Sequence, residues 1–269
     1  MTEVRESAVA GQFYPADPTV LRTTVARLLA DAGAPEVPPP KALIAPHAGY
    51  IYSGPVAASA YARLSPHRDT YRRVVLLGPC HYVGISGLAM PGADVFRTPL
   101  GDIPVDRAFV DRRRISELKV NDATHAPEHS LEVHLPFLQT VLGEFSLVPI
   151  VVGNARPGEV ANVLDKLWDG PETLIVVSSD LSHYLPYDQA RANDHETRLS
   201  IERLEPDNIG PQDACGCYAV NGLLEEAKKK KLTITTLDLR NSGDTAGSRD
   251  RVVGYGAWLF TEEQQWCSQ

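Results

Sequence analysis

Short runs of branched apolar residues alternate along the chain with longer segments in which apolar residues return every three or four positions. Continuous apolar runs of this length are typical of strands buried on both faces of a sheet. They lie at 42–45, 74–77, 147–152, 174–177 and 232–239. The segments with helical periodicity lie at 54–64, 107–118, 131–142, 158–167, 189–204 and 217–230. This alternation predicts a three-layer α/β/α fold around a central, mostly parallel sheet.

Two regions outside these segments carry sharper signals. Asp17 and Pro18 precede an apolar-periodic segment that stops at Gly33, which predicts the first helix. Residues 95–105 look like a hairpin turned at 100–102, and residues 252–260 look like a closing strand. A hairpin pairs antiparallel strands, so we expect a mixed sheet. No internal repeat or linker is evident, and a single domain over 1–269 is expected.

Composition narrows the class of protein. With 269 residues, 43% of them hydrophobic and 22% charged, the chain is an ordinary globular sequence with enough length for a large core. The net charge of −8 and the scattered basic residues argue against nucleic-acid binding. The first ten residues lack an apolar segment and the apolar stretches are short, so neither a signal peptide nor a membrane-spanning segment is expected. The four cysteines are too few for a disulfide framework, so a cytoplasmic location is expected.

Three histidines come directly after predicted strands, namely His47, His81 and His183. Ligands of open α/β sheets bind beyond the carboxyl ends of the strands. Asp244 follows the run at 232–239 and would bring a carboxylate to the same edge. Two imidazoles and one carboxylate form the ligand set of non-haem Fe(II) oxygenases, which predicts His47, His81 and Asp244 as metal ligands. His183 is then a histidine free to move protons, unless each histidine merely bonds to a loop backbone.

The densest group of titratable residues is the segment 128–136. His129 and His134 are five positions apart, about 140° around a helix, which excludes the zinc-protease pattern H-E-x-x-H. We expect Glu128 and His129 to face the pocket at the mouth of a helix, as substrate contacts or as partners of the ligands. His134 is expected to serve the structure. A plain helix start with acidic residues in its first turn is the alternative.

The cysteines and tyrosines give weaker signals. Cys215 and Cys217 form C-x-C without a second pair, which favours a structural role and places Cys215 near the site. Cys80 beside His81 is a candidate soft ligand or reactive thiol. Four tyrosines flank the histidine turns as candidate pocket walls: Tyr50, Tyr52, Tyr82 and Tyr184. No G-x-G-x-x-G, P-loop or G-x-S-x-G motif occurs, so dinucleotide, phosphoryl-transfer and hydrolase functions lose their usual support.

Six motifs, in this order along nearly the whole chain, strongly resemble those of the Memo family, which in prokaryotes is protein B of the AmmeMemoRadiSam system. They are 9–15 (VAGQFYP), 45–54 (APHAGYIYSG), 78–82 (GPCHY), 128–136 (EHSLEVHLP), 178–184 (SSDLSHY) and 241–244 (NSGD). The resemblance implies a fold similar to the catalytic subunit of class III extradiol dioxygenases. Those enzymes hold a non-haem Fe(II) by two histidines and a carboxylate.

Carried over by motif, the resemblance implies His47 and His81 as metal ligands and His183 as the acid/base histidine, with Asp180 close by. Fe(II) is the expected metal, with Cu or Zn as alternatives. The leading hypothesis is a dioxygenase-like oxidoreductase acting on a small molecule. The alternatives are a non-catalytic metal- or ligand-binding accessory protein and a phosphopeptide-binding adaptor, the latter disfavoured because no arginine cluster is present. A radical S-adenosylmethionine protein and an AMMECR1-type protein are the implied partners.

Overall fold

A mixed sheet of nine strands forms the centre of the molecule in the computed structural model, which describes residues 2–33, 35 and 37–262. Eight strands follow the order β10-β12-β2-β9-β3-β8-β4-β7, and β11 pairs with β12. Their bounds are β2 Pro40–Ala45, β3 Arg73–Pro79, β4 Leu88–Met90, β7 Leu118–Val120, β8 Ser146–Val152, β9 Thr173–Ser178, β10 His183–Leu185, β11 Thr233–Asn241 and β12 Val252–Thr261. The central strands β2, β9, β3 and β8 are parallel, whereas β12 and β4 run antiparallel to their neighbours β2 and β8.

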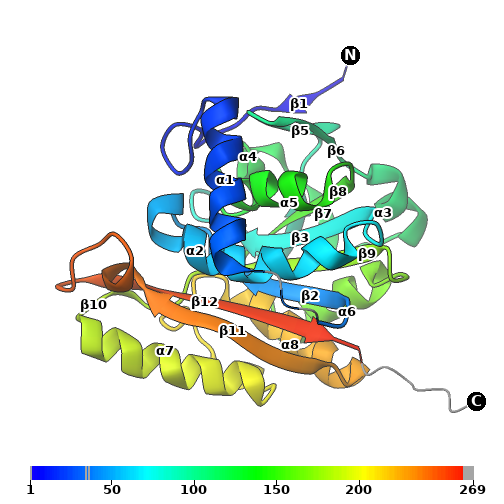
Figure 1. Ribbon diagram of the computed structural model, residues 1–269. Coiled ribbons are helices and arrows are strands. Elements are labelled where there is room, and N and C mark those ends of the chain that lie inside the picture. Colours follow the sequence, from blue (N-terminus) through cyan, green and yellow to red (C-terminus); the bar gives the residue numbers. More distant parts are fainter. Residues whose placement is uncertain (1, 34, 36, 263–269) are drawn as a thin grey trace, which may run out of the picture.

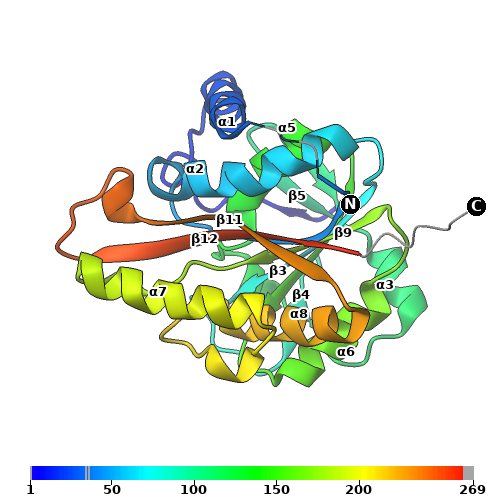
Figure 2. The same cartoon turned by 60° about the horizontal axis from the view of Figure 1, so that its bottom comes forward.

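Helices cover both faces of this sheet (Figures 1 and 2). One layer contains α1 (Pro18–Ala32), α2 (Tyr50–Tyr61) and α5 (Leu135–Leu142), and the other contains α6 (Pro157–Leu167), α7 (Tyr187–Glu202) and α8 (Cys217–Lys230). Side chains of a strand point alternately to the two faces. In β2, Leu43 and Ala45 join the core under α2, and Ala42 and Ile44 join the core on the opposite face. The expected three-layer α/β/α fold with a mixed sheet is therefore confirmed.

Local signals in the sequence locate several helix ends. The Asp17 carboxylate accepts hydrogen bonds from the backbone N–H groups of Thr19 and Val20, and Gly33 ends α1 with φ +66°. A carboxylate at the N-cap satisfies donors that have no partner inside the helix, and glycine adopts positive φ without a steric penalty. The helix expected at 217–230 also has the observed bounds.

The chain departs from the predicted elements in three places. The helix expected over 107–118 ends early as α3 (Arg107–Arg113), because Arg114 takes a left-handed conformation and the chain then enters β7. The segment 131–142 starts with a 3₁₀ turn, η2 (Glu132–His134), and becomes α-helical only at α5. The run 232–239 belongs to β11, which pairs only with β12 and is mostly half-buried, so its expected burial on both faces is wrong.

A second, three-stranded sheet packs beside the first helical layer. It has the order β1-β5-β6, with β1 Val4–Arg5, β5 Val95–Thr98 and β6 Gly101–Pro104. The antiparallel pair β5–β6 is the hairpin expected over 95–105. Its pairing with β1 fixes the N-terminal segment against the loop that carries Glu128, because Arg5 reaches that loop.

The remaining elements are short. They are α4 (Asp122–His125) and the 3₁₀ turns η1 (Ala62–His67), η3 (Pro206–Asn208) and η4 (Ser242–Asp244). Cys267 lies outside the described residues, whereas Cys80, Cys215 and Cys217 are free thiols. Within the described part of the chain, every helix is too short or too polar to traverse a lipid bilayer.

Candidate metal site

The carboxyl ends of three neighbouring parallel strands bring the candidate residues together. His47 lies two residues after β2, Asp180 two residues after β9, and His81 two residues after β3. Strand β9 lies between β2 and β3, with Ala45 in register with Ser178 and Leu77 with Val177. Parallel strands end at the same edge, so residues 133 positions apart in sequence become neighbours.

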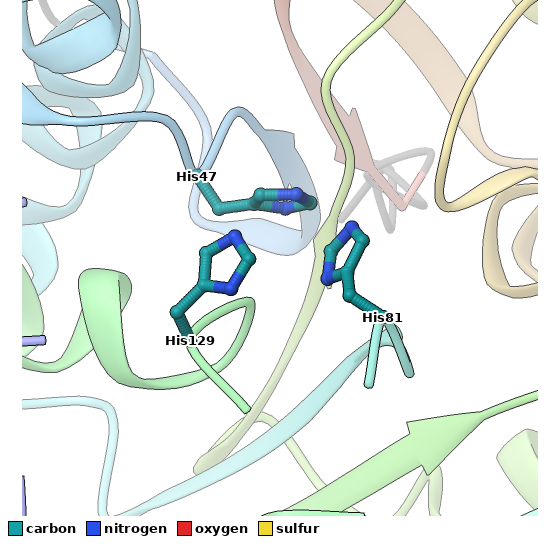
Figure 3. Close-up of side chains that lie close together, drawn as sticks. All are labelled: His47, His81 and His129. Carbon is teal, nitrogen blue, oxygen red and sulfur yellow. The ribbon is translucent and has the colours of Figure 1, made fainter. Parts of the chain in front are cut away.

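Three imidazole rings converge at this edge: those of His47, His81 and His129 (Figure 3). One nitrogen from each ring lies within 4.8 Å of the others. The rings of His81 and His129 are stacked with their centroids 4.6 Å apart, and the ring of His47 stands edge-on to both, with centroids 5.2 and 5.5 Å away. The third histidine comes from the loop between α4 and η2, which crosses the sheet edge from the first helical layer.

His47 is enclosed by polar atoms on both sides of its ring. Its Nδ1 lies 2.6 Å from Ser178 Oγ, and its Nε2 lies 3.4 Å from Cys215 Sγ and 4.0 Å from Asp180 Oδ2. Burial, together with the neighbouring histidines, lowers the pKa of His47 well below its ordinary value. The ring therefore stays neutral at physiological pH, which is the state in which an imidazole binds metal.

His81 is oriented by Glu128. The His81 Nδ1 lies 2.8 Å from Glu128 Oε1, and the backbone N–H of His81 donates to Oε2 of the same carboxylate at 2.5 Å. Burial opposes ionisation of Glu128, but these bonds and the backbone N–H of Ser130 outweigh it and lower its pKa to about 2. A carboxylate on Nδ1 fixes the ring orientation and leaves Nε2 as the ligand atom, the usual arrangement behind metal-binding histidines.

His129 carries an unpaired buried nitrogen. Its Nδ1 is buried without a hydrogen-bond partner in the described part of the chain and lies 3.5 Å from Glu128 Oε1. Phe13 packs against the ring with a centroid distance of 4.7 Å, and burial lowers the pKa of His129 to about 4. A buried imidazole with an unused polar atom is a costly feature unless a ligand satisfies it.

This geometry fits a transition-metal ion. Metal–imidazole bonds are about 2.0–2.1 Å long, so nitrogens on one tetrahedral ion lie about 3.3 Å apart. Small side-chain rotations would close the observed 4.8 Å to that spacing. All three rings are held by packing or hydrogen bonds, and at least two already have Nδ1 engaged elsewhere.

The cluster opens into a cavity of about 640 Å³. His183 lines this cavity, and its Nδ1 lies 2.7 Å from the carbonyl oxygen of Leu181. Because a carbonyl only accepts, Nδ1 carries the proton and Nε2 is left as a proton acceptor. Aromatic and polar side chains from several loops complete the lining: Phe13, Tyr52, Tyr82, Tyr184, Ser242, Ser248, Arg251 and Tyr255.

Asp180 is the buried carboxylate of the cavity. Its Oδ1 accepts the backbone N–H of His47 at 2.8 Å, and burial raises its pKa to about 6 despite that bond. The group is therefore poised to gain or lose a proton near neutral pH. It lies beside His47 and on the cavity wall, where the sequence motif suggests an acid/base partner for His183.

Asp244 does not join the three histidines, which corrects the expected ligand set. Its Oδ2 accepts the backbone N–H of Asn241 and its Oδ1 accepts the hydroxyl of Tyr187. The 3₁₀ turn η4 folds this carboxylate back onto its own loop, beside α7. The physical reason is local, because an acidic residue three positions after Asn241 completes a capping box.

Two other candidates also lie elsewhere. Tyr50 is buried, and its hydroxyl donates to the carbonyl of Val133 at 2.7 Å, so it packs the core between α2 and α5. The thiol of Cys80 points to the carbonyl of Thr124 at 3.7 Å, and burial raises its pKa. Neither side chain lines the histidine cavity.

Two functional neighbours carried only weak sequence signals. His129 was expected as a substrate contact or as a partner of the ligands, yet it contributes the third imidazole of the cluster. Ser178 follows an apolar run and opens the motif at 178–184, but it was not predicted as a site residue, and its hydroxyl lies against His47. The position of Cys215 near the site agrees with the expectation from its turn, since Gly216 packs directly against Ser179.

Comparison with known proteins identifies the family of the chain. The model of the family described as Memo-like protein matches residues 5–259. A MEMO1 family protein of Aquifex aeolicus is 36% identical over 273 residues, covering 96% of this chain and 99% of the relative. A MEMO1 family protein of Methanosarcina barkeri is 36% identical over 271 residues, covering 94% and 98%. The chain therefore belongs to the Memo family.

Proposed function

We propose that the protein is a metal-dependent, dioxygenase-like oxidoreductase that binds Fe(II) at His47, His81 and His129 and acts on a small molecule in the adjoining cavity. The observation that carries this proposal is the convergence of three buried or half-buried imidazoles, one nitrogen of each lying within 4.8 Å of the others. Neutral imidazole nitrogens bind Fe(II), Cu and Zn. Fe(II) would supply open coordination positions and a redox-active centre for the activation of O₂, and the electrons that reduce O₂ overall would come from the oxidised substrate.

The residues around the metal have separable tasks in this proposal. Glu128 orients His81, and Ser178 contacts His47 from behind. His183 presents a free Nε2 to the cavity and takes a proton from a hydroxyl of the bound substrate. Asp180 holds or releases a second proton beside it, and the tyrosines around the cavity pack against the substrate.

A second candidate function rests on the position of Cys215. Its Sγ lies 3.4 Å from His47 Nε2, and burial raises the pKa of the thiol. A bound metal ion would displace the proton of this thiol, and a thiolate beside imidazoles suits Cu(I) or Zn(II) better than Fe(II). This observation favours a metal-binding accessory protein, which would work with a radical S-adenosylmethionine protein and an AMMECR1-type protein and catalyse no reaction itself.

Metal content and oxygen consumption distinguish the two functions. The protein is purified without oxygen, its metals are measured by elemental analysis, and the apoprotein is reloaded with Fe(II), Cu(I) or Zn(II). The enzyme proposal requires Fe(II) at about one per chain and oxygen uptake with catechol or a related small molecule, lost in the His183→Ala variant. Tight Cu(I) or Zn(II) binding without oxygen uptake, reduced in Cys215→Ala, would support the accessory function instead.

A further inference from the structure

A continuous hydrogen-bonded chain runs behind the metal site into the core. The Tyr61 hydroxyl lies 2.7 Å from His134 Nδ1, and His134 Nε2 lies 2.7 Å from Ser178 Oγ. Ser178 Oγ in turn lies 2.6 Å from the carbonyl oxygen of Ser130 and 2.6 Å from His47 Nδ1. Tyr61, His134, Ser178 and His47 are each at most 1% exposed. Buried polar groups in such a chain must share their hydrogens without conflict.

Each hydrogen bond in this chain contains one hydrogen atom. The carbonyl group of Ser130 determines which partner donates that hydrogen in each bond. Ser130 offers only an acceptor, so the Ser178 hydroxyl must donate to it. Ser178 Oγ then has two lone pairs and no further hydrogen to offer. The contacts from His134 Nε2 and His47 Nδ1 must therefore both be N–H donors.

The hydrogen bond between Tyr61 and His134, at the other end of the hydrogen-bonded chain, also indicates that His134 is protonated on Nε2. The buried Tyr61 hydroxyl has His134 Nδ1 as its hydrogen-bond partner, and donating to that nitrogen is the arrangement that leaves no buried hydroxyl hydrogen unpaired. His134 is then protonated on Nε2, the nitrogen that faces Ser178. Burial lowers the pKa of His134 to about 3, which keeps the ring in its singly protonated form.

We propose that Ser178, with His134 and Tyr61 behind it, is a positioning residue that holds His47 as the Nδ1–H tautomer and so keeps His47 Nε2 free to bind a metal. The inference deepens the proposed metal site and rests on it. His134 thus has a role beyond packing, because its N–H occupies the second lone pair of Ser178. Glu128 accepts the Nδ1–H of His81 in the same way. The tautomers of the two strand-end histidines are therefore fixed by different groups, a neutral hydroxyl for His47 and a carboxylate for His81.

The tautomer can be measured without any metal. Long-range ¹H–¹⁵N correlation spectra of the apoprotein with labelled histidine separate the two tautomers, and loss of one signal in His47→Gln and of another in His134→Gln assigns them. We expect His47 protonated on Nδ1 and His134 on Nε2. A wild-type His47 protonated on Nε2 would overturn the proposal.

Zn²⁺ affinity, measured by calorimetry, tests the consequence. Ser178→Ala should let the Nε2–H tautomer of His47 appear and weaken Zn²⁺ binding about 10 to 100-fold. His134→Gln keeps a donor toward Ser178 and an acceptor toward Tyr61, so its Zn²⁺ affinity should stay within about threefold of wild type, whereas His134→Leu should lose more. Ser59→Ala removes another buried hydroxyl, bonded to Val56 O inside α2, and serves as the matched control.

The possible outcomes separate the two proposals. Unchanged tautomer and unchanged Zn²⁺ affinity in Ser178→Ala would overturn the positioning role while the metal site stands. Failure of the wild-type protein to bind Zn²⁺, Fe(II) or Cu(I) would overturn the metal site, and the apoprotein spectra would still decide the tautomer. Equal loss in Ser178→Ala and Ser59→Ala would show a general packing effect and contradict the proposal.

Discussion

Two buried polar clusters lie on either side of the loop that carries Glu128, and they differ in how completely their atoms are paired. On one side Arg5 and Glu132 form an ion pair that is almost inaccessible to solvent. On the other side the three histidines meet at the strand ends. Both clusters cost free energy to bury, but only one of them leaves polar atoms open toward a cavity.

The Arg5 cluster is saturated. Arg5 donates to the carbonyls of His125 and Glu128 as well as to Glu132. Glu132 also accepts the backbone N–H groups of Ala8 and Val9 and the hydroxyl of Tyr14. Each nitrogen of the Arg5 guanidinium and each oxygen of the Glu132 carboxylate has a hydrogen-bond partner, so the task of the pair is to fix the N-terminal segment against the site loop.

In the histidine cluster, only some of the ring nitrogens have a strong hydrogen-bond partner. The Nδ1 atoms of His47 and His81 are bonded to Ser178 and Glu128, and the Nε2 atom of His47 has the Cys215 thiol as its neighbour at 3.4 Å. The contrast teaches that burial and charge alone do not mark a binding site. A binding site is marked by lone pairs that have no hydrogen-bond partner within the folded protein.

The largest effect on the free energy of unfolding is expected in the cluster around Arg5 and Glu132. Glu132→Gln leaves the Arg5 guanidinium buried without its counter-charge and should lower the free energy of unfolding by about 3–5 kcal/mol. Denaturant titration measures this change. Asp102→Asn, which breaks the exposed pair with Arg97, should change stability little. Equal effects of the two variants would contradict the special role of the buried pair.

In the histidine cluster, loss of a ligand should remove the metal and leave the fold intact. His47→Ala should weaken Zn²⁺ or Fe(II) binding more than about 100-fold, because one of three imidazole ligands is lost. Elemental analysis after dialysis measures the stoichiometry. His67→Ala is the control, since His67 bonds to the carbonyl of Val37 away from the cluster. Unchanged stoichiometry in His47→Ala would exclude the site.

The group behind a ligand should matter less than the ligand itself. Glu128→Gln keeps an acceptor for His81 Nδ1 but removes the negative charge, and should weaken metal binding about 10 to 100-fold. Calorimetric titration gives the affinity. Glu159→Gln, which changes an exposed side chain of α6, provides the comparison. A Glu128→Gln protein with wild-type affinity would show that His81 needs no carboxylate.

The pH dependence of stability follows from the buried histidines. Burial lowers the pKa of His125 to about 4, whereas its unfolded value is near 6.5. The stabilisation from keeping it neutral is present above pH 6.5 and is lost as the pH falls toward 4. Between pH 7 and pH 5 this group alone should cost roughly 2 kcal/mol. Denaturant titrations of His125→Gln should show a smaller fall, and an identical fall would contradict the assignment.

The smallest effect is expected at Asp244. Its carboxylate bonds within its own turn and to Tyr187, so Asp244→Asn should change metal affinity by less than about threefold. The same calorimetric titration decides the question. A loss as large as that in His47→Ala would show that Asp244 reaches the metal after all.

The sequence by itself determined the three-layer arrangement and the sheet edge at which His47 and His81 lie. Apolar runs predicted β2, β3, β8 and β9, and strand ends in a parallel sheet meet at one edge whatever the details of packing. That rule was enough to bring His47 and His81 together. Helix caps such as Asp17 and Gly33 are local and were readable for the same reason.

Tertiary structure alone decided which groups complete the site. His129 reaches the cluster because Arg5 and Glu132 tie its loop across the sheet edge, and Asp244 leaves it because Asn241 and Tyr187 engage its carboxylate. Those contacts join residues 57 to 127 positions apart or depend on the conformation of a single turn, and hydrophobic periodicity carries no information about them. The positions of the strands along the chain follow from hydrophobic runs, whereas ligand choice depends on which lone pairs remain unpaired after folding.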